Sequence, residues 1–236
     1  MHYNNDGYEA VYNPGSDTCE VTVRGYSKPD GSFVRRGGPA HPDDKPILRI
    51  SLDTSCAKLA GVADCVPKAV RETFHDALWD RRDLVGMPIF RNKPADDAER
   101  RLFAAAYDAA QKVRSSSIVL GVDKLVFATE PPLFDTVDCF CRDKSGAFWL
   151  MLCDAGDAKD CDIGRRLSLA AYVLEAGEYV PTNAAVRLGV WRLAPNGCRF
   201  AEVVNDRIAA RDAVIRHLLT PPFLQTTHKE NPHDDN

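Results

Sequence analysis

The sequence predicts an α/β (α+β) domain in which a mixed central sheet, containing an antiparallel hairpin, is flanked by helices. From residue 94 onward the patterns run helix, strand, strand, strand, helix, strand, strand, helix. The segment AFWLMLC (147–153) is apolar on both alternating faces, as expected of a strand covered on both sides. RDKSG (142–146) is short enough to join this strand to the preceding one as a hairpin.

The composition is that of a globular protein with ample core material: 236 residues, 44% hydrophobic and 27% charged. A net charge of -4 argues against strong sequence-blind binding to nucleic acid, although a local basic groove is compatible with an acidic total. No apolar stretch approaches the roughly 20 residues that span a bilayer. The N-terminal MHYNNDGYEA lacks the pattern of a signal peptide. We therefore expect an intracellular protein (cytoplasmic, nuclear or carried in a virion) with no membrane partner and with its eight cysteines reduced.

The first 50 residues have a different pattern from the rest. CEVTVRGYSKPDGSFVRR (19–36) reads as a hairpin about a Pro-Asp-Gly turn, and GGPAHPDDKP (37–46) as a connector. ILRISL then returns to strand. We expect a small β-rich N-terminal segment over 1–50, the main domain over 51–219, and a flexible tail over 220–236.

Two helices open the main domain. PKAVRETFHDALWDRR (67–82) has a proline in its first turn and apolar residues at helical spacing. PADDAERRLFAAAYDAAQKVR (94–114) is rich in alanine, with acids near its start and bases near its end, where each favours the helix dipole.

The remaining elements follow in order. SIVLGV or KLVFA forms the first strand, TVDCFC (136–141) the second and AFWLMLC the third. A helix over 164–177 ends at Gly177. Strands over 184–193 and 198–204 flank the turn APNG, and a helix over 206–219 closes the domain.

Three acids stand where a metal site could form. Glu99 lies on the helix over 94–114, Asp138 lies within the second strand, and Asp154 ends the third. Carboxylates on adjacent hairpin strands can converge on Mg²⁺, which prefers oxygen ligands and can activate water for attack on a phosphate. Three polar residues of the next helix share one face through spacings of three and four: Arg165, Ser168 and Tyr172.

This arrangement resembles the PD-(D/E)XK nuclease superfamily, particularly its phage, viral and bacterial recombination exonucleases. The segments DDAERRLF, FDTVDCFC, LMLCDAG and SLAAYVLE fall in the order of that group's motifs, and the resemblance covers roughly residues 50 to 193. It implies a restriction-endonuclease-like core and DNA as substrate. It also implies Glu99, Asp138 and Asp154 as catalytic acids that hold Mg²⁺, with Arg165, Ser168 and Tyr172 lining the substrate site.

Two positions depart from the family pattern. Asp154-Ala155-Gly156 places glycine where the family has a catalytic lysine, and Ser168 replaces a glutamine. Loss of one such stabilising group often costs about 10²–10³ in rate. Lys159 could reach back from the loop to serve as the catalytic lysine, and Arg165 or Arg166 could supply charge without proton transfer.

These departures predict a degenerate nuclease with lost or weakened exonuclease activity and a binding or structural role. Two alternatives stay open: an active Mg²⁺-dependent nuclease with a relocated lysine, and an unrelated α/β interaction domain. DNA, a protein partner and a second copy of the chain all remain candidate partners.

Each candidate residue also has a structural interpretation. Asp138 is explained by pairing with an arginine or by an open sheet face, Asp154 by capping a turn, and Glu99 by the helix dipole. His75 is explained by packing, and GRR (164–166) by a solvated face. Four cysteines could form a zinc site, but their spacing favours buried free thiols: Cys139, Cys141, Cys153 and Cys161.

Overall fold

The structure is a computed structural model, and it describes residues 2–5, 8–13, 15–16, 18–27, 33–35, 45–62, 66–79, 93–156, 159–177, 179–181 and 183–219. The N-terminal strands are β1 (His2–Asn5), β2 (Tyr8–Asn13), β3 (Thr18–Ser27), β4 (Phe33–Arg35) and β5 (Lys45–Leu52). The helices are α1 (Cys56–Ala60), α2 (Lys68–Trp79), α3 (Asp97–Ser116), α4 (Asp160–Ala176) and α5 (Arg207–Leu219). The central strands are β6 (Ser117–Thr129), β7 (Pro132–Asp143), β8 (Phe148–Asp154), β9 (Val186–Ala194) and β10 (Gly197–Val203).

The central sheet has five strands in the order β10-β9-β8-β7-β6. β6, β7 and β8 are antiparallel neighbours, β8 and β9 run parallel, and β9 and β10 form a hairpin. The parallel pair is connected through α4, the crossover that a parallel connection needs. The predicted mixed sheet with an antiparallel hairpin is therefore confirmed.

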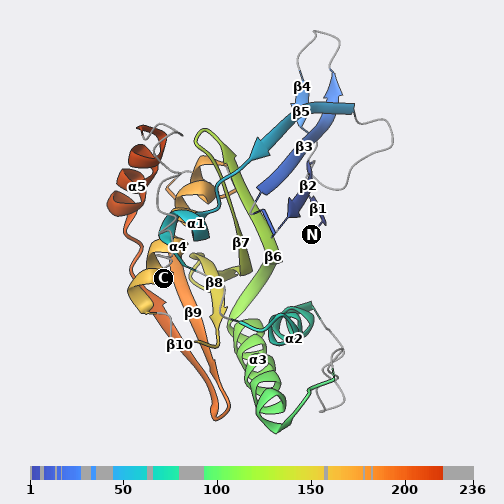
Figure 1. The fold of residues 1–236 in the computed structure, drawn as a ribbon, viewed down its shortest axis with the longest axis vertical. Coiled ribbons are helices and arrows are strands. Elements are labelled where there is room, and N and C mark those ends of the chain that lie inside the picture. Colours follow the sequence, from blue (N-terminus) through green and yellow to red (C-terminus); the bar gives the residue numbers. More distant parts are fainter. Residues whose placement is uncertain are drawn as a thin grey trace, which may run out of the picture.

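Helices cover both faces of this sheet (Figure 1). One core cluster joins α2 and α3 to side chains such as Cys139, Met151 and Cys153, and the other joins α1, α4 and α5 to Leu150, Leu152 and Val190. β8 lies between these two layers with every residue from Trp149 to Asp154 buried. This explains why its sequence is apolar on both faces.

The N-terminal strands form a second, antiparallel sheet in which β5 pairs with β3. Its core residues Cys19, Val21 and Leu52 pack with Leu125 and Phe134 of β6 and β7. β5 continues to Leu52, across the boundary expected near residue 50. The pairing of β3 with β4 agrees with the hairpin predicted over 19–36, whose central turn lies outside the described residues. The tail predicted over 220–236 also lies outside the described residues.

The helix predictions hold with small shifts at their ends, while β6 is longer than expected. SIVLGV and KLVFA belong to one strand, with a register shift between Val119 and Gly121. Among the described residues, no helix is both long enough and apolar enough to cross a membrane.

Candidate functional site

Asp138 is buried on β7 and is held by α2. Its Oδ1 accepts a hydrogen bond from His75 Nε2 at 2.9 Å and lies 3.2 Å from Arg71 Nε. Its Oδ2 accepts from the backbone N–H of Cys153 at 2.7 Å. The backbone pairing of β7 with β8 ends at Cys139 and Met151. The N–H of Cys153 lies beyond this paired stretch, and the Asp138 carboxylate is its acceptor. The contact with Arg71 matches the structural interpretation of Asp138, and His75 packs at the same point.

The charge of Asp138 is stabilised where it lies. Burial alone would raise the pKa of this carboxyl, but the hydrogen bond from His75 and the positive charge of Arg71 outweigh burial and lower it. Asp138 is therefore an ionised carboxylate, and its oxygens already contact His75, Arg71 and the backbone N–H of Cys153. It serves to join α2 to the sheet.

Asp154 ends β8 and is held by an arginine of the next strand. Asp154 and Arg192 are register partners on β8 and β9, and the Nη1 of Arg192 donates to the Oδ2 of Asp154. The Nη2 of Arg192 donates to the carboxylate of Asp160 in the first turn of α4. The guanidinium thus bridges two carboxylates, with the Asp154 side chain only 5% exposed.

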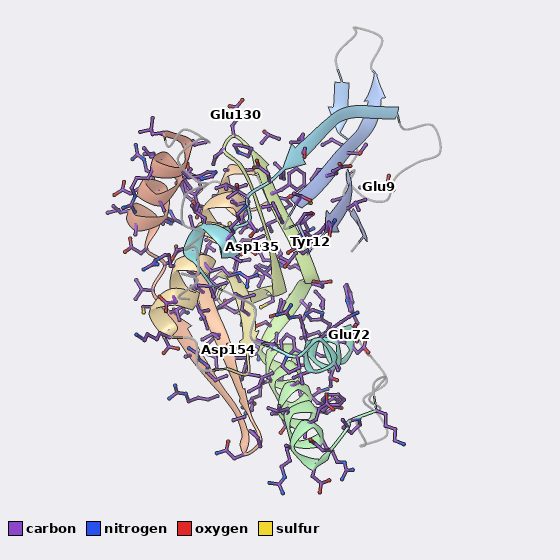
Figure 2. All side chains as sticks on the ribbon, in the orientation of Figure 1. Glu9, Tyr12, Glu72, Glu130, Asp135 and Asp154 are labelled. Atoms are coloured by element: carbon purple, nitrogen blue, oxygen red, sulfur yellow. The ribbon has the colours of Figure 1, made fainter. Side chains whose placement is uncertain are left out.

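Asp138 and Asp154 are held by different elements of the fold. Cys153 packs in the cluster under α2 and α3, so its strand neighbour Asp154 points to the opposite face, where α4 begins. Asp138 contacts α2 on the first of these faces. Figure 2 labels Asp154 near the end of β8.

Glu99 lies in the first turn of α3, three residues after the N-cap residue Asp96. The side chain of Asp96 accepts from the N–H of Glu99 at 2.8 Å, and the carboxylate of Glu99 accepts from the N–H of Ala95. The first contact satisfies a backbone donor that a helix start leaves open, and the second ties the residue before the N-cap to the first turn. The contacts of Glu99 are therefore those of a helix cap.

Ser168 is buried on α4, where it fixes the segment that leads into α5. Its hydroxyl accepts from the N–H of Asp206 at 3.0 Å and lies 3.4 Å from the carbonyl of Val204. Arg165 is exposed, and together with Ser168 it lines a pocket of about 450 Å³ between α4, β10 and α5. Tyr172 is half-buried and packs against the core on this side of the sheet.

Lys159 occupies the N-cap position of α4 and is exposed. Its place at the helix start puts it one residue from Asp160, which Arg192 binds. The positive charge that contacts Asp154 thus comes from Arg192, on another strand, and the sequence analysis did not identify it. The sequence did carry one signal for Arg192. Side chains alternate between the two faces of β9, so Arg192 lies on the same face as the buried Leu188 and Val190.

A second buried ion pair was also missed. Arg166 makes two parallel hydrogen bonds to Asp135 of β7, at 2.9 and 3.0 Å, and a third to the carbonyl of Thr136. Both side chains are at most 5% exposed. Figure 2 shows Asp135 on β7 near α1. The interpretation of GRR as a solvated face is wrong for Arg166, because Asp135 compensates its burial.

Three cysteines are buried beneath α2 and α3 as free thiols: Cys139, Cys141 and Cys153. Burial raises the pKa of the Cys153 thiol well above its usual value, which keeps it neutral and poor as a metal ligand. In the part of the chain that the structure describes, no three His, Cys, Asp or Glu side chains are grouped so that they could hold a metal.

The residues present do not fit the magnesium that the resemblance implies. A shared cation needs carboxylates that converge with oxygens free to bind it. Here the oxygens of Asp138 contact His75, Arg71 and the N–H of Cys153, and Asp154 is bound by Arg192. No protein-family model and no curated protein matches the sequence.

Proposed function

We propose that this chain has a nuclease-type fold of the PD-(D/E)XK kind, that it has lost metal-dependent DNA cleavage, and that it acts by binding. The order α3, β6, β7, β8, α4, β9 supports the first part, because it follows the family's order of motif-bearing helix, three strands and helix. β8 also ends in Asp154 at the position of the family's strand-end acid.

The bridge made by Arg192 carries the second part. Its guanidinium donates to the carboxylates of both Asp154 and Asp160, so the Asp154 oxygen that a metal would bind already has a cationic partner. An arginine is always charged at physiological pH. A metal at Asp154 would have to displace this bridge against the repulsion of like charges.

The sequence departures point the same way. Gly156 stands two residues after Asp154, where the family carries a lysine, and Lys159 lies at the exposed start of α4. Arginine supplies charge but does not transfer protons.

The direct test is DNA degradation. We expect linear double-stranded DNA, with and without a 5′-phosphate, to stay intact when incubated with the purified protein in Mg²⁺ or Mn²⁺. Degradation that persists in wild type and disappears in Asp154→Asn would contradict the loss of activity. Arg207→Ala, which removes an arginine from an exposed pair with Glu175, serves as a matched surface control in that assay.

A further inference from the structure

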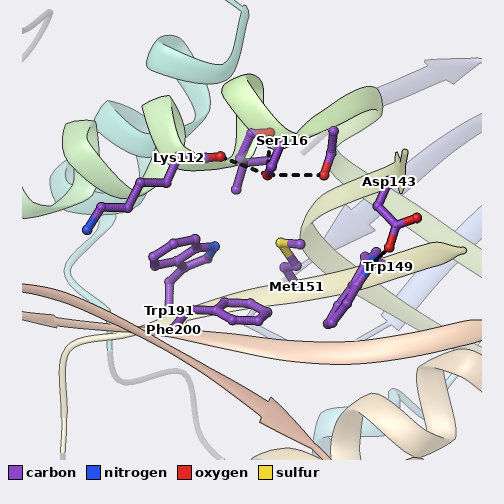
Figure 3. Close-up of a pocket in the computed structure, with 9 residues that line it drawn as sticks. Lys112, Ser116, Asp143, Trp149, Met151, Trp191 and Phe200 are labelled. Carbon is purple, nitrogen blue, oxygen red and sulfur yellow. Dashed lines mark hydrogen bonds between the residues drawn. The ribbon is translucent and has the colours of Figure 1, made fainter. Parts of the chain in front are cut away.

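A pocket of about 290 Å³ lies on the α2 and α3 face of the central sheet, away from the Arg192 bridge. Its lining comes from the end of α3 and from all five central strands: Lys112, Val113, Ser116, Ser117, Asp143, Trp149, Met151, Trp191 and Phe200. Figure 3 shows the aromatic rings along one side of the pocket and the end of α3 along the other. This volume suits one ring system rather than an extended ligand.

The aromatic wall is built from three packed rings. The centroid of the Phe200 ring lies 5.0 Å from that of Trp191 and 5.5 Å from that of Trp149. Gly189 makes room for this arrangement, because a Cβ there would lie 2.4 Å from the Phe200 ring. Such a wall offers flat π surfaces on which a planar ligand can stack.

The two indole donors of this wall differ in their hydrogen bonding. The indole N–H of Trp149 donates to Asp143 at 2.8 Å, whereas the buried indole N–H of Trp191 meets no acceptor among the described residues. Figure 3 shows the indole nitrogen of Trp191 directed toward the thioether of Met151, inside the pocket. A buried donor without an acceptor is unfavourable, and a ligand acceptor would satisfy it. Rotation of the flexible Met151 side chain opens the path.

The two ends of the pocket differ in charge. The ammonium of Lys112 lies 6.0 Å from the Trp191 ring, and its hydrogen bond to Cys198 Sγ is to a weak acceptor. At the other end, Asp143 already accepts from the backbone and hydroxyl of Ser145, from the N–H of Ala147 and from Trp149. The group available for a charged ligand is therefore a cation.

We propose that this pocket binds a nucleotide: the base stacks on the aromatic wall and accepts a hydrogen bond from Trp191, and the phosphate lies at Lys112. A nucleobase is planar and carries ring acceptors, and a phosphate suits a lysine ammonium. The site lies on the opposite face from Asp154 and Arg192, so it stands whether or not the metal chemistry is lost.

The first test is calorimetric titration of the intact protein with AMP, adenosine and ribose 5-phosphate, followed by GMP, CMP and UMP. We expect AMP to bind more tightly than adenosine, and ribose 5-phosphate to give no binding in the same range. Binding of ribose 5-phosphate equal to that of AMP would overturn the proposal. So would the absence of binding by all four nucleotides at millimolar concentration.

Variants assign the contacts. Trp191→Phe keeps the ring and removes the N–H, so we expect about fivefold to tenfold weaker adenosine binding. Lys112→Met should reduce AMP to the affinity of adenosine. Arg211→Met removes an exposed charge on α5, which packs on the opposite face of the sheet from the pocket. This control should change the affinity of neither adenosine nor AMP. Unchanged binding in both pocket variants would overturn the assignment, and the ligand series in wild type tests it independently of their folding.

A 5′-phosphorylated deoxyadenosine decamer distinguishes the two sources of such a ligand. Tighter binding of the decamer than of AMP, lost in Trp191→Phe, supports the end of a single strand as the natural occupant. Equal affinity of the two supports a free nucleotide. If AMP does not bind and Trp191→Phe leaves decamer binding unchanged, the single strand binds elsewhere on the protein. That result would overturn the pocket assignment.

Discussion

Asp154 and Arg192 are paired twice, once by the register of the parallel strands β8 and β9 and once by the ion pair between their side chains. The second guanidinium nitrogen reaches Asp160, so the same arginine ties the end of β8 to the start of α4. Asp154, at the end of β8, therefore contributes to the packing of β8, β9 and α4 through Arg192.

Arg192→Ala should lower the free energy of unfolding by about 3 kcal/mol, because it leaves the nearly buried Asp154 without its partner. Urea unfolding of both proteins measures this difference. Arg207→Ala, which breaks an exposed pair with Glu175, should cost less than about 1 kcal/mol. Equal losses in the two variants would show that the bridge adds nothing beyond a surface pair.

Asp138→Asn should also destabilise the protein, by about 3 kcal/mol, because Arg71 and His75 then lose the carboxylate between them. Chemical denaturation at neutral pH is again the measurement. Asp97→Asn, which removes an exposed partner of Arg100, provides the control. A stability gain in Asp138→Asn would point instead to an uncompensated carboxylate of the kind that awaits a metal.

Asp143 should make stability depend on acid pH. Hydrogen bonds from Ser145 and Trp149 lower the pKa of this carboxyl to about 2, from a usual value of 3.8. A lowered pKa in the folded state contributes stability above the unfolded value, and this stability is lost as the pH falls from about 4 to about 2.

Unfolding of wild type and Asp143→Asn between pH 5 and pH 2.5 isolates this contribution, since all other carboxyl groups are shared. The stability difference between them should shrink as the pH falls through that window. A difference that stays constant down to pH 2.5 would mean that Asp143 has the same pKa in both states.

Gly189→Ala should destabilise the protein by about 1–3 kcal/mol, because the new Cβ would collide with the Phe200 ring at 2.4 Å. Thermal unfolding compares it with Gly164→Ala on α4, where the nearest atom is 3.6 Å away and alanine favours the helix. Phe200→Leu should relieve part of the loss in the double variant. No difference between the two alanine variants would contradict the packing described for the aromatic wall.

The secondary structure was largely predictable from the sequence because it depends on local patterns. The alanine-rich α3 and the apolar β8 each carry a periodicity that one segment alone reveals. β1 and β2 were not predicted, since short polar strands lack such a signal. β6 was divided between two candidates because Gly121 and the positive φ of Asp123 interrupt its pattern.

The site was less predictable because its determinants are tertiary. Asp138 is 63 residues from His75 in the chain, and Asp154 is 38 from Arg192. The sequence placed the acids on the right strands, but it could not specify which layer each would face or which arginine would reach it. Both depend on how α2 and β9 pack against the sheet.

Calorimetric titration of Mg²⁺ into the wild-type protein, beside Asp154→Asn, tests the central claim most directly. With Arg192 between Asp154 and Asp160, neither protein should show specific binding at millimolar Mg²⁺. Stoichiometric binding to wild type that vanishes in Asp154→Asn would show that the carboxylate still holds a metal, and would contradict the replacement of the metal by arginine.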